Sequence, residues 1–244
     1  MHRLGRAVKT PGGLPSPSPH LATLLAEKRR TLSAQFELLD ETYTIAGRAY
    51  AFTRVADPEQ VLDQVIAAEG RGEVGRMPYW AELWESAIGI GEWLHQHPAT
   101  AAGKRVLDLG CGMGFAGMIA ASLGATVTFV DIEAQSLEFA LLNALAWSER
   151  VSARPVDWQT DRMDDRYDLI LGADVLYDRA QWEYLNDFWL HHLAPDGAVL
   201  LGEPTRPNGA PFPDWIRLCG WKLELSEVRL EDRSKTIRLL TLRR

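Results

Sequence analysis

Residues 106–117 read Val-Leu-Asp-Leu-Gly-Cys-Gly-Met-Gly-Phe-Ala-Gly, with an acid at Asp108 and glycine at every second position from Gly110 to Gly114. An apolar run precedes the glycines and another follows them. This pattern predicts a buried strand, a tight turn and a helix that begins near Phe115. Glycines let a ligand lie against bare backbone, and a helix N-terminus offers unpaired N–H groups. The turn therefore predicts a site for a nucleotide-like ligand.

Two classes of ligand fit this turn. Gly112-x-Gly114-x-x-Gly117 matches the dinucleotide fingerprint, which is a weak signal by itself. Asp108-x-Gly110-x-Gly112-x-Gly114 matches the loop that binds S-adenosylmethionine (SAM). A carboxylate this close would repel a pyrophosphate at the helix N-terminus, whereas SAM has no phosphate and carries an ammonium and a sulfonium. The acid therefore favours SAM as the cofactor and S-adenosylhomocysteine as its product, with NAD or an empty turn as the alternatives.

Acids stand at or just after the ends of four successive predicted strands, at Asp108, Asp131, Asp157 and Asp174. In an open α/β sheet, ligands bind at the carboxyl ends of the strands. We expect Asp108 near the methionine part of SAM and Asp131 on the ribose hydroxyls. We expect Asp157 on the adenine amino group, with Trp158 beside the ring. The alternative for Asp131 and Asp157 is an ordinary helix N-cap.

Asp174-x-x-Tyr177 follows the strand where the transferred methyl group should lie. This spacing aims a carboxylate and a phenol at an incoming nucleophile, and we assign Asp174 and Tyr177 to catalysis. We assign Ile132, next to Asp131, and Ala173, the last residue of its strand, to the cofactor site.

Two further segments are expected to complete the pocket. Tyr79, Trp80 and Trp84 stand just ahead of the first ligand-binding strand, where they either pack in the core or form a lid over the cofactor. Aromatic faces attract a sulfonium as they attract an ammonium, by roughly 0.5–2 kcal/mol each. We assign Trp84 to the cofactor, and Tyr79 and Trp80 to the substrate. After the fifth strand, Glu203 and Arg206 are the charged candidates for substrate contact, although Arg206 could instead pair with a surface acid.

The bulk properties narrow the class of protein. At 244 residues, 46% of them hydrophobic, the chain can form one large domain with additional N-terminal structure. The net charge of −7 disfavours a nucleic-acid partner. No apolar run approaches the ~20 residues of a membrane span, and Cys111 and Cys219 offer neither a disulfide framework nor a metal cluster. We expect a monomeric cytoplasmic protein without nucleic-acid, membrane or metal partners.

The elements that position these residues follow from periodicity and turn signals. The expected elements are a helix over 21–32, a β-hairpin over 37–55, a helix from Asp57-Pro58, a helix ending near His97, strands over 105–109, 126–130, 151–156, 167–173 and 198–202 that alternate with helices over 115–123, 133–147 and 180–193, and terminal strands over 221–230 and 235–242. Alternating strands and helices predict a parallel, doubly wound sheet, and the terminal pair predicts an antiparallel hairpin. Together they indicate a seven-stranded, mostly parallel Rossmann-like sheet of the class I methyltransferase type.

With these residues in place, the chain resembles the seven-β-strand protein lysine methyltransferases, in the branch that includes the methyltransferase of the electron-transfer flavoprotein β-subunit. Residues 78–81 (Pro-Tyr-Trp-Ala), followed by Trp84, match the aromatic entry of that branch. Residues 174–177 (Asp-Val-Leu-Tyr) match the acidic-x-x-aromatic motif of the wider family. Residues 203–206 (Glu-Pro-Thr-Arg) are similar to its acidic-Pro-x-Arg stretch, with Glu where Asp is expected. The likeness covers roughly residues 75–244.

The resemblance implies a three-part chain: a disordered tail over 1–19, a helix and β-hairpin extension over 20–75, and a SAM-dependent methyltransferase domain over 76–244. It also implies in-line methyl transfer to a lysine of a protein substrate. Trp80, Trp84 and Tyr177 would favour the neutral amine by desolvation, and Asp174 would orient and capture the acceptor. The alternatives are a small-molecule, nicotinamide-like N-methyltransferase and a non-catalytic protein that binds SAM or a partner.

Overall fold

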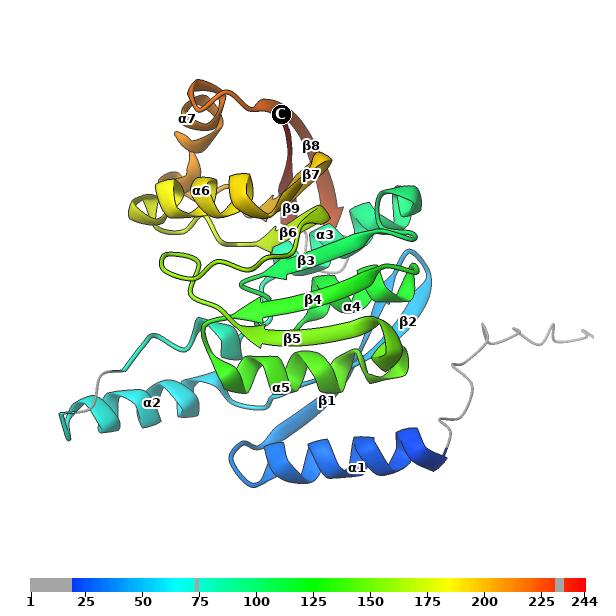
Figure 1. Ribbon diagram of the computed structural model, residues 1–244. Coiled ribbons are helices and arrows are strands. Elements are labelled where there is room, and N and C mark those ends of the chain that lie inside the picture. The colour runs from blue at the N-terminus through cyan, green and yellow to red at the C-terminus, as the bar shows by residue number, and fades with distance from the viewer. Residues whose placement is uncertain (1–18, 73–74, 231–234) are drawn as a thin grey trace, which may run out of the picture.

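The computed structural model describes residues 19–72, 75–230 and 235–244 (Figure 1). Apart from Pro19, the tail expected over 1–19 lies outside the described residues, as do parts of the 70–75 loop and of the final turn. The helices are α1 (Pro19–Ser33), α2 (Pro58–Glu69), α3 (Glu85–Gln96), α4 (Phe115–Ser122), α5 (Ala134–Asn143), α6 (Trp182–His192) and α7 (Phe212–Leu218). The strands are β1 (Leu38–Ile45), β2 (Arg48–Val55), β3 (Arg105–Leu109), β4 (Thr126–Asp131), β5 (Val151–Pro155), β6 (Tyr167–Ala173), β7 (Leu193–Glu203), β8 (Lys222–Leu230) and β9 (Lys235–Arg243).

The described residues form a seven-stranded sheet in the order β5-β4-β3-β6-β7-β9-β8. The strands from β3 to β7 pair in parallel, and β9 pairs antiparallel with both β7 and β8. The Rossmann-like methyltransferase sheet and its terminal hairpin are therefore confirmed. The order reverses between β3 and β6, and this is the position where an α/β sheet opens a crevice for a ligand.

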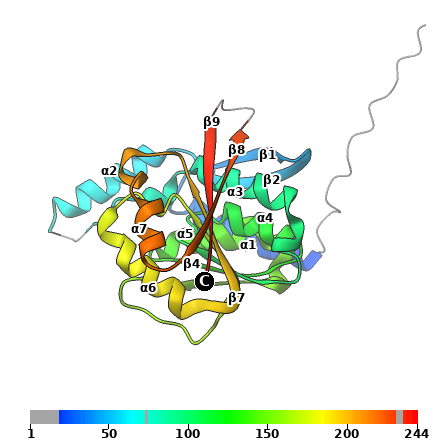
Figure 2. The ribbon, with the colours of Figure 1, turned by 90° about the horizontal axis from the view of Figure 1, so that it is seen from above.

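Helices cover both faces of the sheet, because alternate residues of each strand bury their side chains on opposite sides (Figures 1 and 2). On β3, Val106 belongs to the core under α3, α4 and α5, whereas Leu107 belongs to the core under α6 and α7. Asp108 shares the face of Val106, so its side chain points toward α4. No described helix is long and apolar enough to cross a membrane.

The N-terminal helix and hairpin pack against the sheet's own helices. α1 lies beside α5 (Figure 1), and the rings of Tyr43 and Phe52 contact the ring of Phe115 with centroids 5.2 and 5.1 Å away. Phe115 is the first residue of α4, directly after the glycine turn. The hairpin therefore supports the helix that follows the turn, while the division of the chain at residue 75 stays a prediction.

Two expected elements have different bounds, and the helix α7 was not expected at all. The helix expected over 133–147 ends at Asn143 and is followed by a 3₁₀ segment, Leu145–Arg150, in which Trp147 is not helical. Asn143 uses its side chain for contacts outside the helix, described below. β7 begins at Leu193 and not at Ala198, because Leu193 pairs with Tyr167 before the register shifts around the expected turn at 194–197.

Asn143 joins the hairpin to the glycine turn. Its Nδ2 donates hydrogen bonds to the carbonyls of Thr53 and Met113, both at 3.0 Å, and its Oδ1 accepts one from the Thr53 N–H at 2.8 Å. Backbone groups that lose their partners inside a protein carry a desolvation cost.

We expect Asn143→Ala to lower the free energy of unfolding by roughly 2 kcal/mol, since it leaves three backbone groups without partners. For a chain of this size, that corresponds to a fall in Tm of about 4–8 °C in a thermal melt. Asn143→Asp is the matched control, because it keeps the acceptor for Thr53 and loses both donors. An alanine variant as stable as the wild type would show that Asn143 does not join these segments.

Candidate active site

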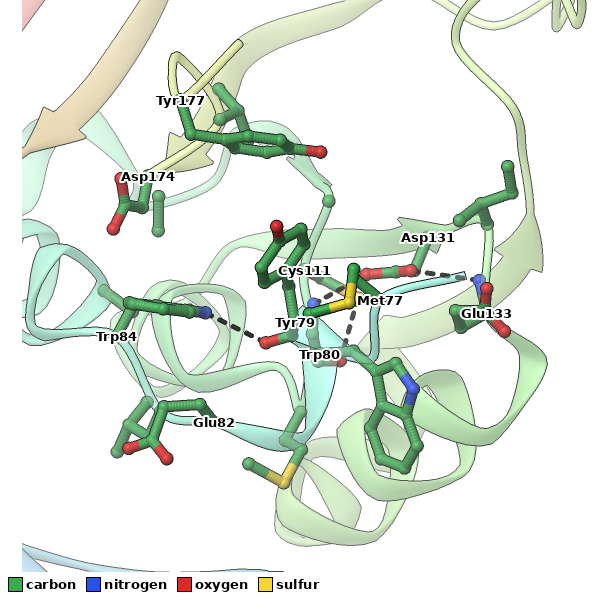
Figure 3. A pocket seen from close by; sticks show the side chains of 18 of the residues that line it. Met77, Tyr79, Trp80, Glu82, Trp84, Cys111, Asp131, Glu133, Asp174 and Tyr177 are labelled. Carbon is green, nitrogen blue, oxygen red and sulfur yellow. Dashed lines mark hydrogen bonds between the residues drawn. The ribbon is translucent and has the colours of Figure 1, made fainter. Parts of the chain in front are cut away.

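A cavity of about 530 Å³ opens at the carboxyl ends of β3, β4 and β6 (Figure 3). This volume lies within the range of about 300–1,000 Å³ that is usual for cofactor sites. The structure brings most of the predicted site residues to its walls: Tyr79, Trp80, Trp84, Gly110, Gly112, Asp131, Ile132, Trp158, Ala173, Asp174, Tyr177 and Arg206. It places four others away from the walls: Asp108, Gly114, Asp157 and Glu203.

The glycines of the turn have two functions: two of them line the cavity, and the third allows α5 to pack closely. Gly110, Gly112 and Gly114 all have positive φ, at 62°, 50° and 84°, a region that residues with a Cβ rarely adopt. Gly110 and Gly112 border the cavity. At Gly114, a Cβ would lie 2.6 Å from that of Ala140 on α5, so this glycine is required for packing.

Asp131 ends β4 at the wall of the cavity. One of its oxygens accepts a hydrogen bond from the Gly112 N–H at 2.9 Å, and the other accepts one from the Glu133 N–H at 3.0 Å (Figure 3). Burial raises the pKa of this carboxyl, and the two hydrogen bonds oppose the rise. Each carboxylate oxygen keeps a further lone pair, so Asp131 can still accept hydrogen bonds from two neighbouring hydroxyls.

Asp108 lies behind the turn, not near the methionine end of the cavity as expected. Its side chain is 1% exposed, and its Oδ2 accepts a hydrogen bond from the Gly117 N–H on α4 at 2.8 Å. A Cβ at Gly117 would lie 2.7 Å from this oxygen, which explains the glycine there. Burial raises the pKa of Asp108 to about 7, and the bond from Gly117 opposes the rise. The acid therefore positions the turn.

Asp157 is also away from the cavity. Its Oδ1 accepts a hydrogen bond from the Gln159 N–H at 2.9 Å, so the carboxylate caps the turn that follows β5. Its neighbour Trp158 does border the cavity, and a Cβ at Gly110 would lie 3.2 Å from the Trp158 ring. Asp157 therefore contacts neither the cavity nor a helix N-terminus, the two roles expected for it, and it caps a turn, while the indole next to it forms the wall.

Aromatic rings form the opposite end of the cavity (Figure 3). The centroids of Tyr79 and Tyr177 lie 5.4 Å apart, and the Trp84 Nε1 donates a hydrogen bond to the Tyr79 carbonyl at 2.9 Å. Burial raises the pKa of the Tyr177 phenol. Trp80 points away from these rings and packs against Phe36 and Phe139, at 5.5 and 5.9 Å. Its indole therefore packs in the core, and it does not join Trp84 and Tyr177 around an acceptor.

Asp174 occupies a backbone conformation that is rare outside glycine. Its φ is 57°, and its N–H donates a hydrogen bond to the Gly202 carbonyl at 2.9 Å. The conformation turns the carboxylate into the cavity, where Arg206 Nη2 and Nε donate to its two oxygens at 2.6 and 3.2 Å. Burial raises the pKa of Asp174, and Arg206 opposes the rise. The aspartate expected to meet the acceptor is therefore already paired.

Glu203 binds the backbone of Arg206 and does not reach the cavity. Its side chain is buried at the end of β7, its Oε1 accepts a hydrogen bond from the Arg206 N–H at 2.6 Å, and its Oε2 forms an ion pair with Arg238 at 2.7 Å. The substrate contact predicted for Glu203 is therefore not found. Instead, this side chain holds the segment that carries Arg206.

The cavity also has walls that no motif marked. The following wall residues were not predicted as site residues: Arg76, Met77, Glu82, Leu83, Ala87, Cys111, Met113, Phe115, Glu133, Val175 and Asn208. Most are immediate neighbours of predicted residues, so adjacency was the signal available. Among the described residues, no group of His, Cys, Asp and Glu could hold a metal ion.

Comparisons with known proteins converge on one family. The profile of a family described as "Lysine methyltransferase" matches residues 65–210. The electron transfer flavoprotein beta subunit lysine methyltransferase of Xenopus laevis is 32% identical over 142 residues, which cover 56% of this chain and 56% of that protein. The protein N-lysine methyltransferase METTL21A of Danio rerio is 32% identical, with 52% and 61% covered. The chain thus spans little more than half the length of these relatives.

One relative has a different acceptor in its name, and solved structures share only the fold. The histidine protein methyltransferase 1 homolog of Dictyostelium discoideum is 28% identical over 156 residues, with 61% of this chain and 49% of that protein covered. The N-methyltransferase NodS of Bradyrhizobium japonicum, in complex with S-adenosylhomocysteine, has a TM-score of 0.52 at 19% identity, covering 76% of this chain and 97% of NodS.

The buried Asp108 makes stability depend on pH. Its pKa is about 7 in the folded chain and ordinarily 3.8. Between these values the folded state holds a proton that the unfolded state has lost, so this group's contribution to stability falls as pH rises from about 4 to about 7. We expect Asp108→Asn to lack this dependence. Its free energy of unfolding, relative to that of the wild type, should therefore rise by about 3 kcal/mol from pH 5 to pH 8. Denaturant unfolding of both proteins at both pH values measures this change. If the stability difference between variant and wild type is the same at pH 5 and pH 8, Asp108 does not have the raised pKa.

Proposed function

The chain belongs to the lysine methyltransferase family, and we propose that it transfers a methyl group from SAM to a lysine side chain of a protein substrate. One observation carries the proposal. The family match includes the aromatic segment, the glycine turn, Asp174, Tyr177 and Arg206, and the walls of one cavity bring these parts together.

The cavity provides a different environment at each end. At the β4 end, the Asp131 carboxylate and the Trp158 ring suit a ribose and an adenine, and Ile132 adds apolar surface beside them. At the β6 end, the rings of Tyr79, Trp84 and Tyr177 suit a cation, because aromatic faces attract positive charge. We assign the nucleoside to the first end and the sulfonium with the acceptor to the second.

SAM supplies a methyl group on a sulfonium, which is already a good leaving group. The acceptor nitrogen forms a bond to the methyl carbon as the carbon–sulfur bond breaks. The electron pair of the carbon–sulfur bond stays on sulfur. The residues of the chain therefore have to position the acceptor and keep water away. Asp174 and Tyr177, placed where the chain leaves β6, are our candidates for that positioning.

A lysine must lose a proton before it can attack. With a pKa near 10.4, it is protonated at pH 7, and removing the proton costs about 4–5 kcal/mol without help. The aromatic rings lower this cost by desolvating the ammonium. Asp174 alone would raise it, since a carboxylate stabilises the charged form. We therefore do not assign Asp174 to deprotonation, and the proton passes to solvent water at the exposed mouth of the cavity.

The open mouth supports a protein acceptor over a small molecule. Tyr79 is 47% exposed and Tyr177 is 38% exposed, so a side chain on a protein surface can reach the rings. A pocket for a small molecule would be closed over. The electron-transfer flavoprotein β-subunit is the first acceptor to test, because the relatives from Xenopus laevis and Danio rerio that carry its name are 32% and 34% identical. We also propose that the chain acts as a cytoplasmic monomer.

We expect calorimetric titration to show that the chain binds SAM and S-adenosylhomocysteine in the micromolar range and does not bind NAD. Incubation with labelled SAM and the flavoprotein β-subunit, or a lysate, should then give methyllysine, identified by mass spectrometry. Absence of SAM binding would overturn the proposed function. Methylhistidine as the product would overturn the choice of acceptor.

We expect Asp174→Asn to keep SAM affinity within about threefold and to reduce methyl transfer by about 100-fold, because the acceptor loses its positioned wall. Asparagine tolerates positive φ, so this variant avoids the strain that alanine would add at φ 57°. Asp214→Asn is the control, since Asp214 is an exposed carboxylate that also pairs with an arginine, on α7. Equal losses of binding and transfer would contradict the assigned role.

A further inference from the structure

Asp174 and Arg206, at the acceptor end of the cavity, form an ion pair with each other. We propose that Arg206 neutralises the Asp174 carboxylate at this end, so that the acceptor lysine binds there as the neutral amine. The inference rests on the proposed function and adds to it a positioning residue that acts through charge. It starts from the finding that Arg206 occupies both oxygens of Asp174, at 2.6 and 3.2 Å.

Two side chains, those of Trp84 and Asp174, hold the guanidinium in place. Its carbon lies 5.1 Å from the centroid of the Trp84 ring, and two of its nitrogens donate to Asp174. The backbone N–H of Arg206 is bound by Glu203 at 2.6 Å. Trp84 is itself fixed by its hydrogen bond to the Tyr79 carbonyl. A cation–π contact and a bidentate ion pair therefore fix the guanidinium as part of the cavity wall.

The exposed side of the ion pair is the positive one. The side chain of Asp174 is 6% exposed, whereas that of Arg206 is 40% exposed. Arg206 also borders the cavity. Asp174 lines the cavity as well, so a nitrogen that enters meets a carboxylate whose two oxygens are already bound by Arg206.

The other charges next to the pair are largely matched. Glu203 pairs with Arg238 at 2.7 Å, and Glu85 pairs with Lys235 at 2.6 Å. Arg76 and Glu133 also line the cavity and form an ion pair at 3.8 Å. Further ionisable groups near this end are Tyr79, Glu82, Asp131, Tyr177 and Asp178. Asp131 faces the glycine turn, where two N–H groups bind it. Besides burial, the carboxylates of Asp178, Asp131 and Asp174 contribute to the raised pKa of Tyr177, so the acids at this end favour an ammonium, and Arg206 pairs with one of them, Asp174.

A positive neighbour changes the protonation of the acceptor. A like charge disfavours the charged form of a titrating group, so Arg206 lowers the pKa of a lysine that enters the cavity. Desolvation by Tyr79, Trp84 and Tyr177 acts in the same direction. Arg206 thus removes the opposing effect that a bare Asp174 would have on deprotonation.

Two analogues of SAM test this without knowledge of the protein substrate. In both, nitrogen replaces sulfur; one carries a 2-aminoethyl arm in place of the methyl group, and the other carries an n-propyl arm of the same length. The arm of the first analogue places an amine near the position of the acceptor nitrogen. Calorimetry from pH 7 to pH 10 compares the two affinities, and titration of the free analogue gives the amine's own pKa.

In the wild type, we expect the aminoethyl analogue to bind at least about tenfold more weakly than the propyl analogue at pH 7, with the gap closing as pH approaches the amine's pKa. In Arg206→Gln, we expect the aminoethyl analogue to bind at least as tightly as the propyl analogue at pH 7, since Asp174 is then free to bind an ammonium. Arg206→Lys should restore the wild-type order. Arg244→Gln is the matched control, because Arg244 also lies 5.1 Å from a tryptophan ring and does not border the cavity.

Tighter binding of the aminoethyl analogue to the wild type at pH 7 would overturn the inference, as would the same order and pH dependence in Arg206→Gln. Equal affinity of both analogues at every pH would also overturn it, since the site would then not discriminate against the ammonium form of the arm. These outcomes differ from failure of the proposed function itself, in which the wild type would bind neither analogue nor SAM.

Discussion

One buried hydrogen bond, from the Gly117 N–H to the Asp108 carboxylate, joins β3 to α4 across the glycine turn. The turn between them has to reverse the chain within a few residues, and it does so through three glycines with positive φ. The bond to Asp108 requires that position 117 have no side chain. The space that a ligand can occupy above the turn follows from this constraint.

The support for the turn extends well beyond the sheet. Asn143 on α5 links the carbonyl of Met113, inside the turn, to Thr53 on the N-terminal hairpin. Phe52 and Tyr43 of the same hairpin contact Phe115, where α4 begins. The hairpin is thus mechanically connected to the cofactor end of the site, although it contributes no residue to the walls of the cavity. Segments of this kind hold binding groups in position without touching the ligand.

The acceptor end is organised around charge. β7 and β9 bring Glu203, Arg238 and Lys235 next to the site, where each pairs with an opposite charge. The pair that remains open to the cavity is Asp174 with Arg206. An enzyme that methylates an amine has to accept a group that is cationic in water and use it as a neutral nucleophile. A covered aspartate behind an exposed arginine suits the second of these states.

The sequence alone determined the class of fold and the location of the site. Spacing of apolar residues predicted the strands and most helices, and β6 has the predicted bounds, because periodicity and glycine turns are local signals. The motifs likewise located Asp131, Trp158, Asp174 and Tyr177 at the cavity, since the carboxyl ends of parallel strands share one edge of a sheet.

Only the tertiary structure decided what each side chain does there. Asp108, Asp157 and Glu203 stand at strand ends as predicted, but a strand-end carboxylate can face a ligand or its own backbone, and spacing does not distinguish the two. In these three cases a backbone N–H is within reach, at Gly117, Gln159 and Arg206, and the carboxylate binds it. The pairing of Asp174 with Arg206 joins residues 32 positions apart, from two strands. Such a contact depends on the register of β6 against β7, which no local pattern in the sequence records.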